Sequence, residues 1–340
     1  MAIENRKGEH VEIALNRSIE SRRRTTGFES MHFTHYSLPE NDFDEINMRC
    51  SFLKHSLAAP FMIVSMTGGF EAAGKINKDL AAAAEKEGIV FALGSQRAML
   101  EKPELKKTFQ VRDVAPKVFL CGNIGAVQLQ DYPQNKLEGL VSTIDADALC
   151  IHLNPLQEVI QKGGDKKWKG VLKQIEKAVD FLGVPVIVKE VGEGINFEAA
   201  KELEKAGVAA IDVAGVGGTS WSAIELHRKG AEAGETFWDW GNPTVQCLKE
   251  CEGKIKVPLI ASGGVRSGLD VAKSIRLGAS LGGAGLPFIK AQNKGGAEGV
   301  RNEIRRWKHE LQLAMFLTRS KTLSDLRKAK LHCGCCCCEE

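Results

Sequence analysis

The 340-residue sequence has no run of about 18 apolar residues, and its first seven residues already carry three charges where a signal peptide needs an apolar stretch. It also has little net charge: 46 Lys and Arg stand against 43 Asp and Glu, a formal charge of +3. So small an excess does not indicate a nucleic-acid partner. A hydrophobic fraction of 43% and a charged fraction of 26% are typical of a globular chain. We therefore expect a soluble, cytoplasmic protein with no membrane and no nucleic-acid partner.

The ten cysteines fall into two groups. Cys121 and Cys150 lie in apolar runs, where a reduced cysteine behaves as a small core residue. Cys333 and the run 335–338 crowd the last eight residues. These thiols could bind a soft metal, but their spacing matches no zinc module, so a disordered appendage is the interpretation we favour.

Short apolar runs alternate with longer amphipathic segments from residue 60 onward, which predicts repeated strand-helix units on a parallel sheet. Eight such units predict a closed (β/α)₈ TIM barrel. The competing architecture, an open doubly wound sheet, usually has a dinucleotide fingerprint after its first strand, and none follows Met66. The expected strands are 61–66, 90–94, 118–123, 148–153, 186–190, 210–214, 259–262 and 279–284.

The barrel accounts for residues 60–331, which leaves an N-terminal extension, 1–59, and a cysteine-rich tail, 332–340. We expect a helix over about 5–16 in the extension. The basic cluster Arg22-Arg23-Arg24 is interpreted as a solvated surface, with nucleic-acid binding as the alternative. Residues 230–236 lengthen the loop after the sixth strand, and could form a lid or a subunit contact.

Glycine-rich loops follow the last two strands, at 262–268 and 282–285. In a barrel of this kind these loops commonly bind phosphate, because backbone without side chains lets N–H groups converge on an anion. Tight turns alone are the alternative. The sequence favours a bound phosphate group without naming the ligand.

Lys189 ends the fifth expected strand, where a buried ammonium needs a negative or hydrogen-bond-accepting partner. A flavin is one such partner, since a lysine beside the ring stabilises its reduced, anionic form. A Schiff-base lysine of an aldolase is the other. The residues alone leave these two interpretations open.

Arg6, Lys7 and His10 share one face of the expected first helix, because His10 lies four and three residues after the other two. An exposed helix face would explain this pattern. Arg97, at the end of the second expected strand, adds another cation that could approach the same ligand. A doubly charged anion such as a diphosphate would fit this set.

The fourth strand leads into His152-Leu153-Asn154-Pro155-Leu156-Gln157-Glu158, which gathers an imidazole, two amides and a carboxylate. Glu158 could bind Mg²⁺ together with substrate oxygens, or form a salt bridge. His152 could transfer protons or make a structural hydrogen bond. Trp221 could form the wall of an apolar pocket or pack in the core.

In combination, these segments resemble the type 2 isopentenyl-diphosphate isomerase family over about residues 5–331. The resemblance rests on the order of several motifs, each weak alone. They are Arg6-Lys7-Gly8-Glu9-His10, Met66-Thr67-Gly68-Gly69, Gly94-Ser95-Gln96-Arg97, Asn123-Ile124-Gly125-Ala126, the segment 152–158, Lys189-Glu190-Val191-Gly192, Asp212-Val213-Ala214-Gly215, Gly217-Gly218-Thr219-Ser220-Trp221, Trp240-Gly241-Asn242-Pro243-Thr244 and Ser262-Gly263-Gly264-Val265-Arg266.

The resemblance implies FMN at the barrel mouth, with NADPH as its reductant, Mg²⁺ as a second cofactor and a small-molecule diphosphate as substrate. Lys189, His152 and Gln157 would be catalytic, and Glu158 would bind the metal. The implied FMN contacts are Met66, Thr67, Gly68, Ser95, Asn123, Lys189, Thr219, Gly263, Gly264, Arg266, Gly283 and Ala284. The implied substrate contacts are Arg6, Lys7, His10, Ser95, Gln96, Arg97, Asn154, Gln157 and Trp221.

The implied reaction interconverts isopentenyl and dimethylallyl diphosphate in isoprenoid biosynthesis, with reduced FMN as the main acid-base group. His152 and Gln157 would then organise the site more than carry protons. The family also implies a homo-oligomer, a tetramer or an octamer. An FMN-dependent barrel oxidoreductase of the hydroxy-acid-oxidase or inosinate-dehydrogenase kind is the alternative. The first would need a histidine base near the seventh strand and the second a nucleophilic cysteine loop, and neither is apparent.

Overall fold

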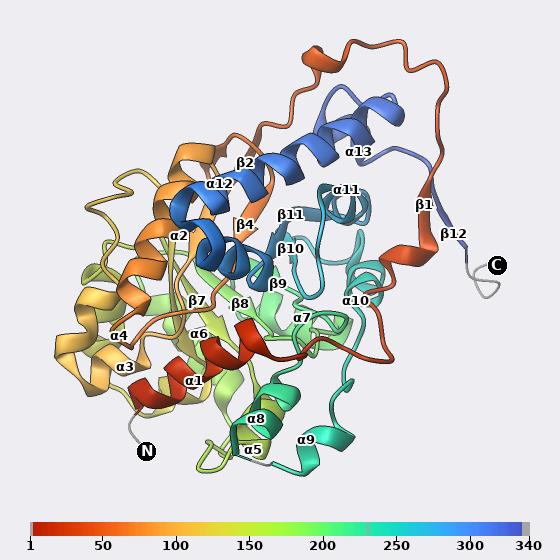
Figure 1. Ribbon diagram of the computed structural model, residues 1–340. Helices are drawn as coiled ribbons and strands as arrows, with labels where there is room; N and C mark the ends of the chain where they lie inside the picture. The colour runs from red at the N-terminus through yellow and green to blue at the C-terminus, as the bar shows by residue number, and fades with distance from the viewer. Residues whose placement is uncertain (1–2, 230, 335–340) are drawn as a thin grey trace.

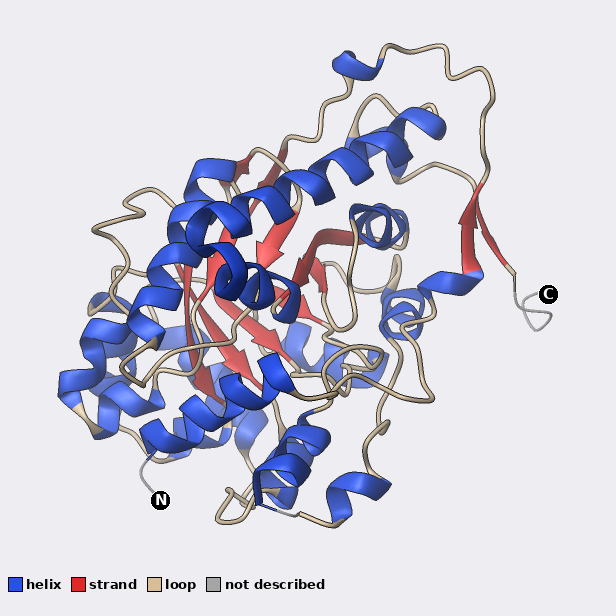
Figure 2. Ribbon diagram, viewed as in Figure 1, coloured by secondary structure: helices blue, strands red, loops and turns tan. Residues whose placement is uncertain are grey.

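Eight parallel strands form a closed barrel in the computed structural model, which describes residues 3–229 and 231–334. Figure 2 shows these strands at the centre of a shell of helices. Every strand expected from the apolar runs is present, and the barrel closes where β11 pairs with β4. The strands are β4 (Phe61–Ile63), β5 (Val90–Ala92), β6 (Leu120–Gly125), β7 (Ala148–His152), β8 (Val186–Lys189), β9 (Ala210–Asp212), β10 (Leu259–Ala261) and β11 (Ala279–Ala284).

Helices of the outer layer follow the strands, and those expected from amphipathic patterning are confirmed. Helix α2 ends at Gly88, which adopts φ 65° and donates its N–H to the carbonyls of Ala84 and Glu85, a common C-terminal cap. The helices after the barrel begins are α2 (Ala73–Glu87), α3 (Arg97–Glu101), α4 (Gln134–Ser142), α5 (Pro155–Ile160), α6 (Val171–Phe181), α7 (Phe197–Lys205), α8 (Trp221–Lys229), α9 (Ala233–Thr236), α10 (Thr244–Cys251), α11 (Gly268–Arg276), α12 (Leu286–Leu317) and α13 (Leu323–Leu326). Within α12, Gly295 and Gly296 leave helical geometry.

The barrel interior is filled by small and medium apolar side chains, including Cys121 and Cys150, which are both fully buried. Their expected role as core residues is confirmed. The hairpin of β2 (Cys50–Phe52) and β3 (His55–Leu57) packs Phe52 and Leu57 against this interior cluster. Part of the N-terminal extension therefore completes the core of the barrel.

The rest of the extension reaches two other parts of the molecule. Helix α1 (Ile3–Asn16) contacts α8 and α12, and Figure 1 shows it crossing the barrel beside the ends of the strands. Strand β1 (Met31–Phe33) pairs antiparallel with β12 (Leu331–Cys333), and this small sheet stands apart from the barrel in Figure 1. The expected tail boundary at residue 332 therefore falls inside a strand, because His332 and Cys333 pair with the extension. Residues 335–340 lie outside the described part.

The basic cluster at Arg22 and the insertion at residues 230–236 both make contacts within the chain. The guanidinium of Arg22 stacks 3.3 Å from the ring centroid of Trp238 and donates to Glu235 at 2.6 Å. Helix α9, in the described part of the 230–236 insertion, packs against α8. None of the helices in the described ranges combines the length and apolar character needed to span a bilayer.

Candidate active site

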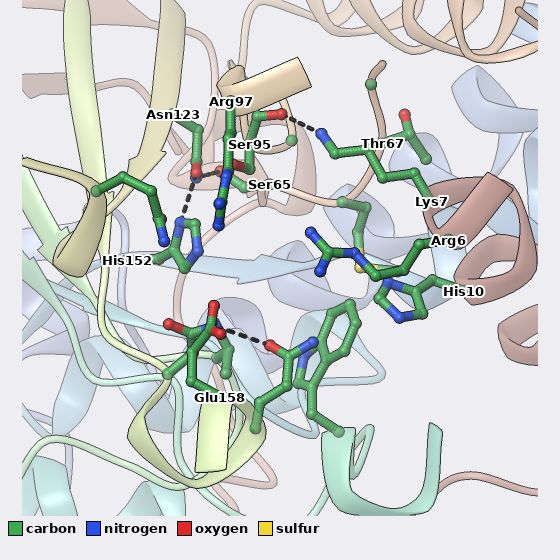
Figure 3. A pocket seen from close by; sticks show the side chains of 18 of the residues that line it. Arg6, Lys7, His10, Ser65, Thr67, Ser95, Arg97, Asn123, His152 and Glu158 are labelled. Carbon is green, nitrogen blue, oxygen red and sulfur yellow. Dashed lines mark hydrogen bonds between the residues drawn. The ribbon is translucent and has the colours of Figure 1, made fainter. Parts of the chain in front are cut away.

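Two adjoining cavities open at the carboxyl ends of the barrel strands, where the chemistry of this fold is expected. Ser65, Met66, Lys189, Val191 and Trp221 line both, so the cavities form one continuous site. We call the cavity that also contains Arg6 and His152 the polar cavity, and the one that also contains Gly263 and Gly264 the glycine-loop cavity. Figure 3 shows the polar cavity.

Basic side chains from two elements converge on the polar cavity. Arg6, Lys7 and His10 project from α1, and Arg97 enters from the start of α3 (Figure 3). The N-terminal helix therefore presents its basic face to the site rather than to solvent. Only the tertiary structure brings these side chains together, because α1 and α3 are distant in the chain.

Burial and mutual repulsion disfavour the charged forms of Arg6 and Lys7. Burial, then the charge of Arg6, lower the pKa of Lys7 to about 7. Burial and the charge of Arg97 also lower the pKa of Arg6. Lys7 donates to the carbonyl of Ser95, a neutral acceptor that does not neutralise it. A bound dianion would stabilise all these cations together.

His10 has a carboxylate partner behind it. Its Nε2 lies 3.0 Å from Oε1 of Glu225, a buried residue on α8, and its ring meets Trp221 edge-on at 5.4 Å. Burial lowers the pKa of His10, and the bond to Glu225 opposes that shift. Glu225 also accepts a bond from Gln157 Nε2 at 3.3 Å. It therefore connects the helix α1 cluster with α5.

His152 lies at the end of β7 with its ring held by Asn123. Its Nδ1 is 2.8 Å from Asn123 Oδ1, and the amide nitrogen of Asn123 donates to Ser65 Oγ at 2.7 Å. Burial, then the charges of Lys189 and Lys7, lower the pKa of His152 to about 3. The imidazole is therefore neutral, and Nδ1, which faces the side-chain oxygen of Asn123, carries its proton.

The N-terminus of α5 contributes buried amides and a carboxylate. Asn154 Nδ2 donates to Gln157 Oε1 at 3.0 Å and to Glu158 Oε1 at 3.2 Å. Asn154 Oδ1 is buried and has no hydrogen-bond partner among the described residues. Glu158 lines the polar cavity with a carboxylate, and one carboxylate together with substrate oxygens is a donor set that Mg²⁺ accepts, so this residue fits that ion. In the described part of the chain, no three His, Cys, Asp or Glu side chains form a denser metal cluster.

Lys189 separates the polar cavity from the glycine-loop cavity. It is 4% exposed and donates to the carbonyl of Glu190 at 2.5 Å. Asp212, its register partner on β9, is buried and accepts a bond from Ser262 Oγ at 2.7 Å. Burial raises the pKa of Asp212, and the charge of Lys189 opposes that shift. A buried ammonium thus faces the place where the two cavities meet.

The glycine-loop cavity is lined by backbone of low bulk. Gly263 and Gly264 adopt φ of 87° and 72°, which favours glycine, and Cβ atoms there would lie 2.0 and 2.2 Å from neighbouring atoms. Both glycines therefore make tight turns, which is compatible with an anion site. Arg266 adds a cation, and Thr219 a hydroxyl, to the same cavity. Together with Lys189, these groups suit a phosphorylated, ring-bearing ligand such as FMN.

Most residues expected from the sequence line the site, and two do not. The side chain of Gln96 is fully buried, donates to Leu140 O at 2.9 Å and accepts from Asn123 N at 2.8 Å. It supports Asn123 and is not among the lining residues. Gly283 lies behind the wall, where a Cβ would meet Val64 and Met62. The remainder come together, including Trp221, which forms a wall of both cavities.

Sequence reasoning missed Glu225, Gln128 and Gln161, which surround or line the polar cavity. One signal was available for two of them. Glu225 follows Trp221 by four residues and Gln161 follows Gln157 by four, so each shares a helix face with an expected site residue.

Comparisons with known proteins agree with this geometry. The sequence profile of the family described as FMN-dependent dehydrogenase matches residues 130–333. A protein of Pyrococcus furiosus named isopentenyl-diphosphate delta-isomerase is 46% identical over 338 residues, covering 96% of this chain and 86% of its own length. One of the same name from Methanothermobacter thermautotrophicus is 46% identical over 329 residues, covering 96% and 92%.

Solved structures with less similar sequences support the fold. A lactate oxidase from Pediococcus acidilactici superimposes with a TM-score of 0.68 at 19% identity, covering 97% of this chain and 94% of that one. A double mutant of flavocytochrome b2 with pyruvate bound gives 0.71 at 18% identity, covering 95% and 82%. At these identities the likeness shows the barrel architecture.

Proposed function

The chain belongs to the type 2 isopentenyl-diphosphate delta-isomerase family, and from that premise we propose that it interconverts isopentenyl diphosphate and dimethylallyl diphosphate. The observation that carries the proposal is the convergence of Arg6, Lys7, His10 and Arg97 on a cavity bordered by Lys189. A diphosphate fits the cations, and the five-carbon chain would extend toward Lys189 and Trp221.

Binding of the diphosphate is the first task of these residues. Arg6 and Arg97 supply planar donors suited to phosphate oxygens, and Lys7 supplies a point charge. Because burial has already removed water from Lys7, an incoming dianion meets a cation that gains from its arrival. Ser95, whose carbonyl fixes Lys7, presents its hydroxyl at the same edge of the cavity.

FMN is the cofactor that the family and the glycine-loop cavity support. When bound and reduced, it supplies an electron-rich ring with a proton-exchanging nitrogen, which is the chemistry that protonation of an unactivated alkene needs. Lys189 would hold the ring in its anionic form, since its ammonium is buried at the junction of the cavities. The loops at Gly263, Gly264 and Ala284, with Arg266, would hold the phosphate.

His152 and Gln157 organise the substrate in this proposal. An imidazole with a pKa of about 3 is a weak base, and the bond to Asn123 holds its ring in one orientation. Gln157 is held between Asn154 and Glu225. Glu158, whose carboxylate lines the polar cavity, would bind Mg²⁺ together with diphosphate oxygens.

NADPH enters the proposal as a priming reductant, because moving a double bond changes no net oxidation state. We place the protein in the cytoplasm, as expected from the sequence. We also propose a homo-oligomer, a tetramer or an octamer, as the family resemblance implies.

The decisive experiment measures isomerisation and NADPH consumption together. Enzyme loaded with FMN and Mg²⁺ is reduced and given isopentenyl diphosphate in deuterated water. We expect deuterium in both isomers and far less than one NADPH oxidised per turnover. One NADPH consumed for each product would instead indicate the FMN-dependent oxidoreductase. An oxidoreductase of the hydroxy-acid-oxidase kind would need a histidine base after β10, and residues 262–268 contain no histidine.

A further inference from the structure

The loop between α5 and α6 ties together two parts of the polar cavity through one residue, Asp165. Its Oδ2 accepts from Arg97 Nη1 at 2.9 Å and from Gln128 Nε2 at 2.9 Å. Both donors line the polar cavity, whereas Asp165 itself lies just outside it. The carboxylate therefore acts on the site through neighbouring side chains.

The backbone of the same residue reaches the carboxylate expected to bind metal. The N–H of Asp165 donates to Glu158 Oε2 at 2.8 Å. The preceding Gly164 packs so closely that a Cβ there would lie 2.0 Å from the Glu158 carbonyl oxygen and 2.8 Å from Oε2. The carbonyl of Asp165 accepts from Trp168 Nε1 at 3.2 Å, which anchors the other side of the loop.

Arg97 is consequently held between two carboxylates. Its Nε donates to Glu101 at 2.7 Å, one turn along α3, while Nη1 donates to Asp165. Burial lowers the pKa of Arg97, but the bond to Glu101 and the charge of Asp165 raise it above its ordinary value. The guanidinium is thereby charged and fixed in direction, and Figure 3 shows it extended into the cavity.

We propose that Asp165 is a positioning residue that couples Arg97 to Glu158. The guanidinium that would bind the diphosphate and the carboxylate that would bind Mg²⁺ are thereby kept in fixed positions relative to each other. The proposal rests on the proposed function. It predicts that loss of the Asp165 side chain frees Arg97 and lets the loop move, which displaces the N–H that orients Glu158. Two ligands that do not touch Asp165 are then both affected by its removal.

Glu101 provides a matched control because it contacts Arg97 but makes no contact with Glu158 that the structure records. A second control, Asp165→Asn, keeps an oxygen acceptor of the same shape for Arg97 while it removes the charge. Asp165 and Arg97 are each partly exposed, with side chains 35% and 27% accessible. Pairs of this kind contribute little to stability, so all three variants are expected to fold.

The test measures binding of inorganic pyrophosphate to FMN-loaded enzyme by titration calorimetry, with and without Mg²⁺. We expect Asp165→Ala to bind pyrophosphate about tenfold more weakly, and to lose most of the gain in affinity that Mg²⁺ gives the native protein. Glu101→Ala should weaken binding but keep the gain from Mg²⁺. Asp165→Asn should restore both quantities to within about threefold of native values.

Each other outcome counts against the coupling. If Asp165→Ala binds pyrophosphate as the native protein does, Asp165 does not position Arg97. If Asp165→Ala and Glu101→Ala lose the Mg²⁺ gain equally, or if Asp165→Asn is as weak as Asp165→Ala, charge near Arg97 explains the effect and coupling through the loop is wrong. Failure of the native protein to bind pyrophosphate would instead contradict the proposed function, and the inference with it.

Discussion

Asn123 presents its Oδ1 to His152 Nδ1 at 2.8 Å while its amide nitrogen donates to Ser65 at 2.7 Å. This arrangement orients the amide and so places the imidazole proton on Nδ1. Gln96, buried behind the strand, accepts the N–H of Asn123 and fixes its backbone. The tautomer of His152 is therefore set by Asn123 and Ser65, while Gln96, bonded to the Leu140 carbonyl of α4, supports the backbone of Asn123.

A first prediction concerns the charge of His152. With a pKa of about 3, it should stay neutral, with its proton on Nδ1, when the pH is lowered from 8 to 5. Nitrogen-15 NMR of histidine-labelled enzyme measures this directly, with the signal assigned by its loss in His152→Asn. An imidazolium signal from His152 at pH 5 would show that burial does not determine the pKa of this residue.

A second prediction concerns Lys7 and substrate affinity. Only the ammonium form attracts a diphosphate, and with a pKa of about 7 it is lost as the pH rises above neutrality. We expect kcat/KM to fall up to about tenfold per pH unit above that value. In Lys7→Arg the cation persists, so the decline should move to higher pH. An unchanged profile in that variant would assign the decline to another group.

A third prediction concerns Glu193 and stability. Glu190 Oε2 accepts three backbone N–H groups, which stabilises its carboxylate, and burial followed by that charge raises the pKa of Glu193 well above its ordinary value. The folded protein therefore keeps the proton of Glu193 to a higher pH than the unfolded chain does. Unfolding releases this proton at any pH between the unfolded and folded pKa values of Glu193. The contribution of Glu193 to the free energy of unfolding therefore falls as the pH rises through that window.

Glu193→Gln has no proton to lose, so its free energy of unfolding should gain on that of the native protein by up to about 1.4 kcal/mol per pH unit above pH 5. Urea unfolding at several pH values measures the difference. The exposed Glu176→Gln should show no such trend. A constant difference between Glu193→Gln and native protein across pH would mean that Glu193 is already ionised.

The sequence was sufficient for the barrel because each strand is a short apolar run and each helix has its own periodicity. The sequence was less informative about contacts between residues that are distant in the chain. Strand β12 is three residues long and exists through pairing with β1, so no local signal marks it. Gln96 sits in a strand-end motif, but its side chain turns inward to Asn123, which the motif does not specify. The general rule for barrels places functional residues at the carboxyl ends of the strands. Asp165 and Glu225 lie beyond those ends, so the rule does not identify them.

The last prediction separates backbone strain from the packing that shapes the glycine-loop cavity. Gly264 has φ +72° and a Cβ there would lie 2.2 Å from Thr26 Cγ2 and 2.5 Å from the Gly217 carbonyl oxygen. Gly253 has nearly the same backbone, φ +69°, with nothing within 4 Å. Gly253→Ala should therefore cost about 1 kcal/mol of stability from backbone strain alone.

Gly264→Ala adds a clash with backbone to the same strain, so we expect a total loss of about 3 kcal/mol together with weaker retention of FMN. Thermal unfolding measures the first effect. Flavin absorbance of the purified protein measures the second, at a temperature where both variants are folded. Because the two glycines share their conformation, equal losses of stability and equal flavin content would show that the close approach of Thr26 and Gly217 does not shape the cavity.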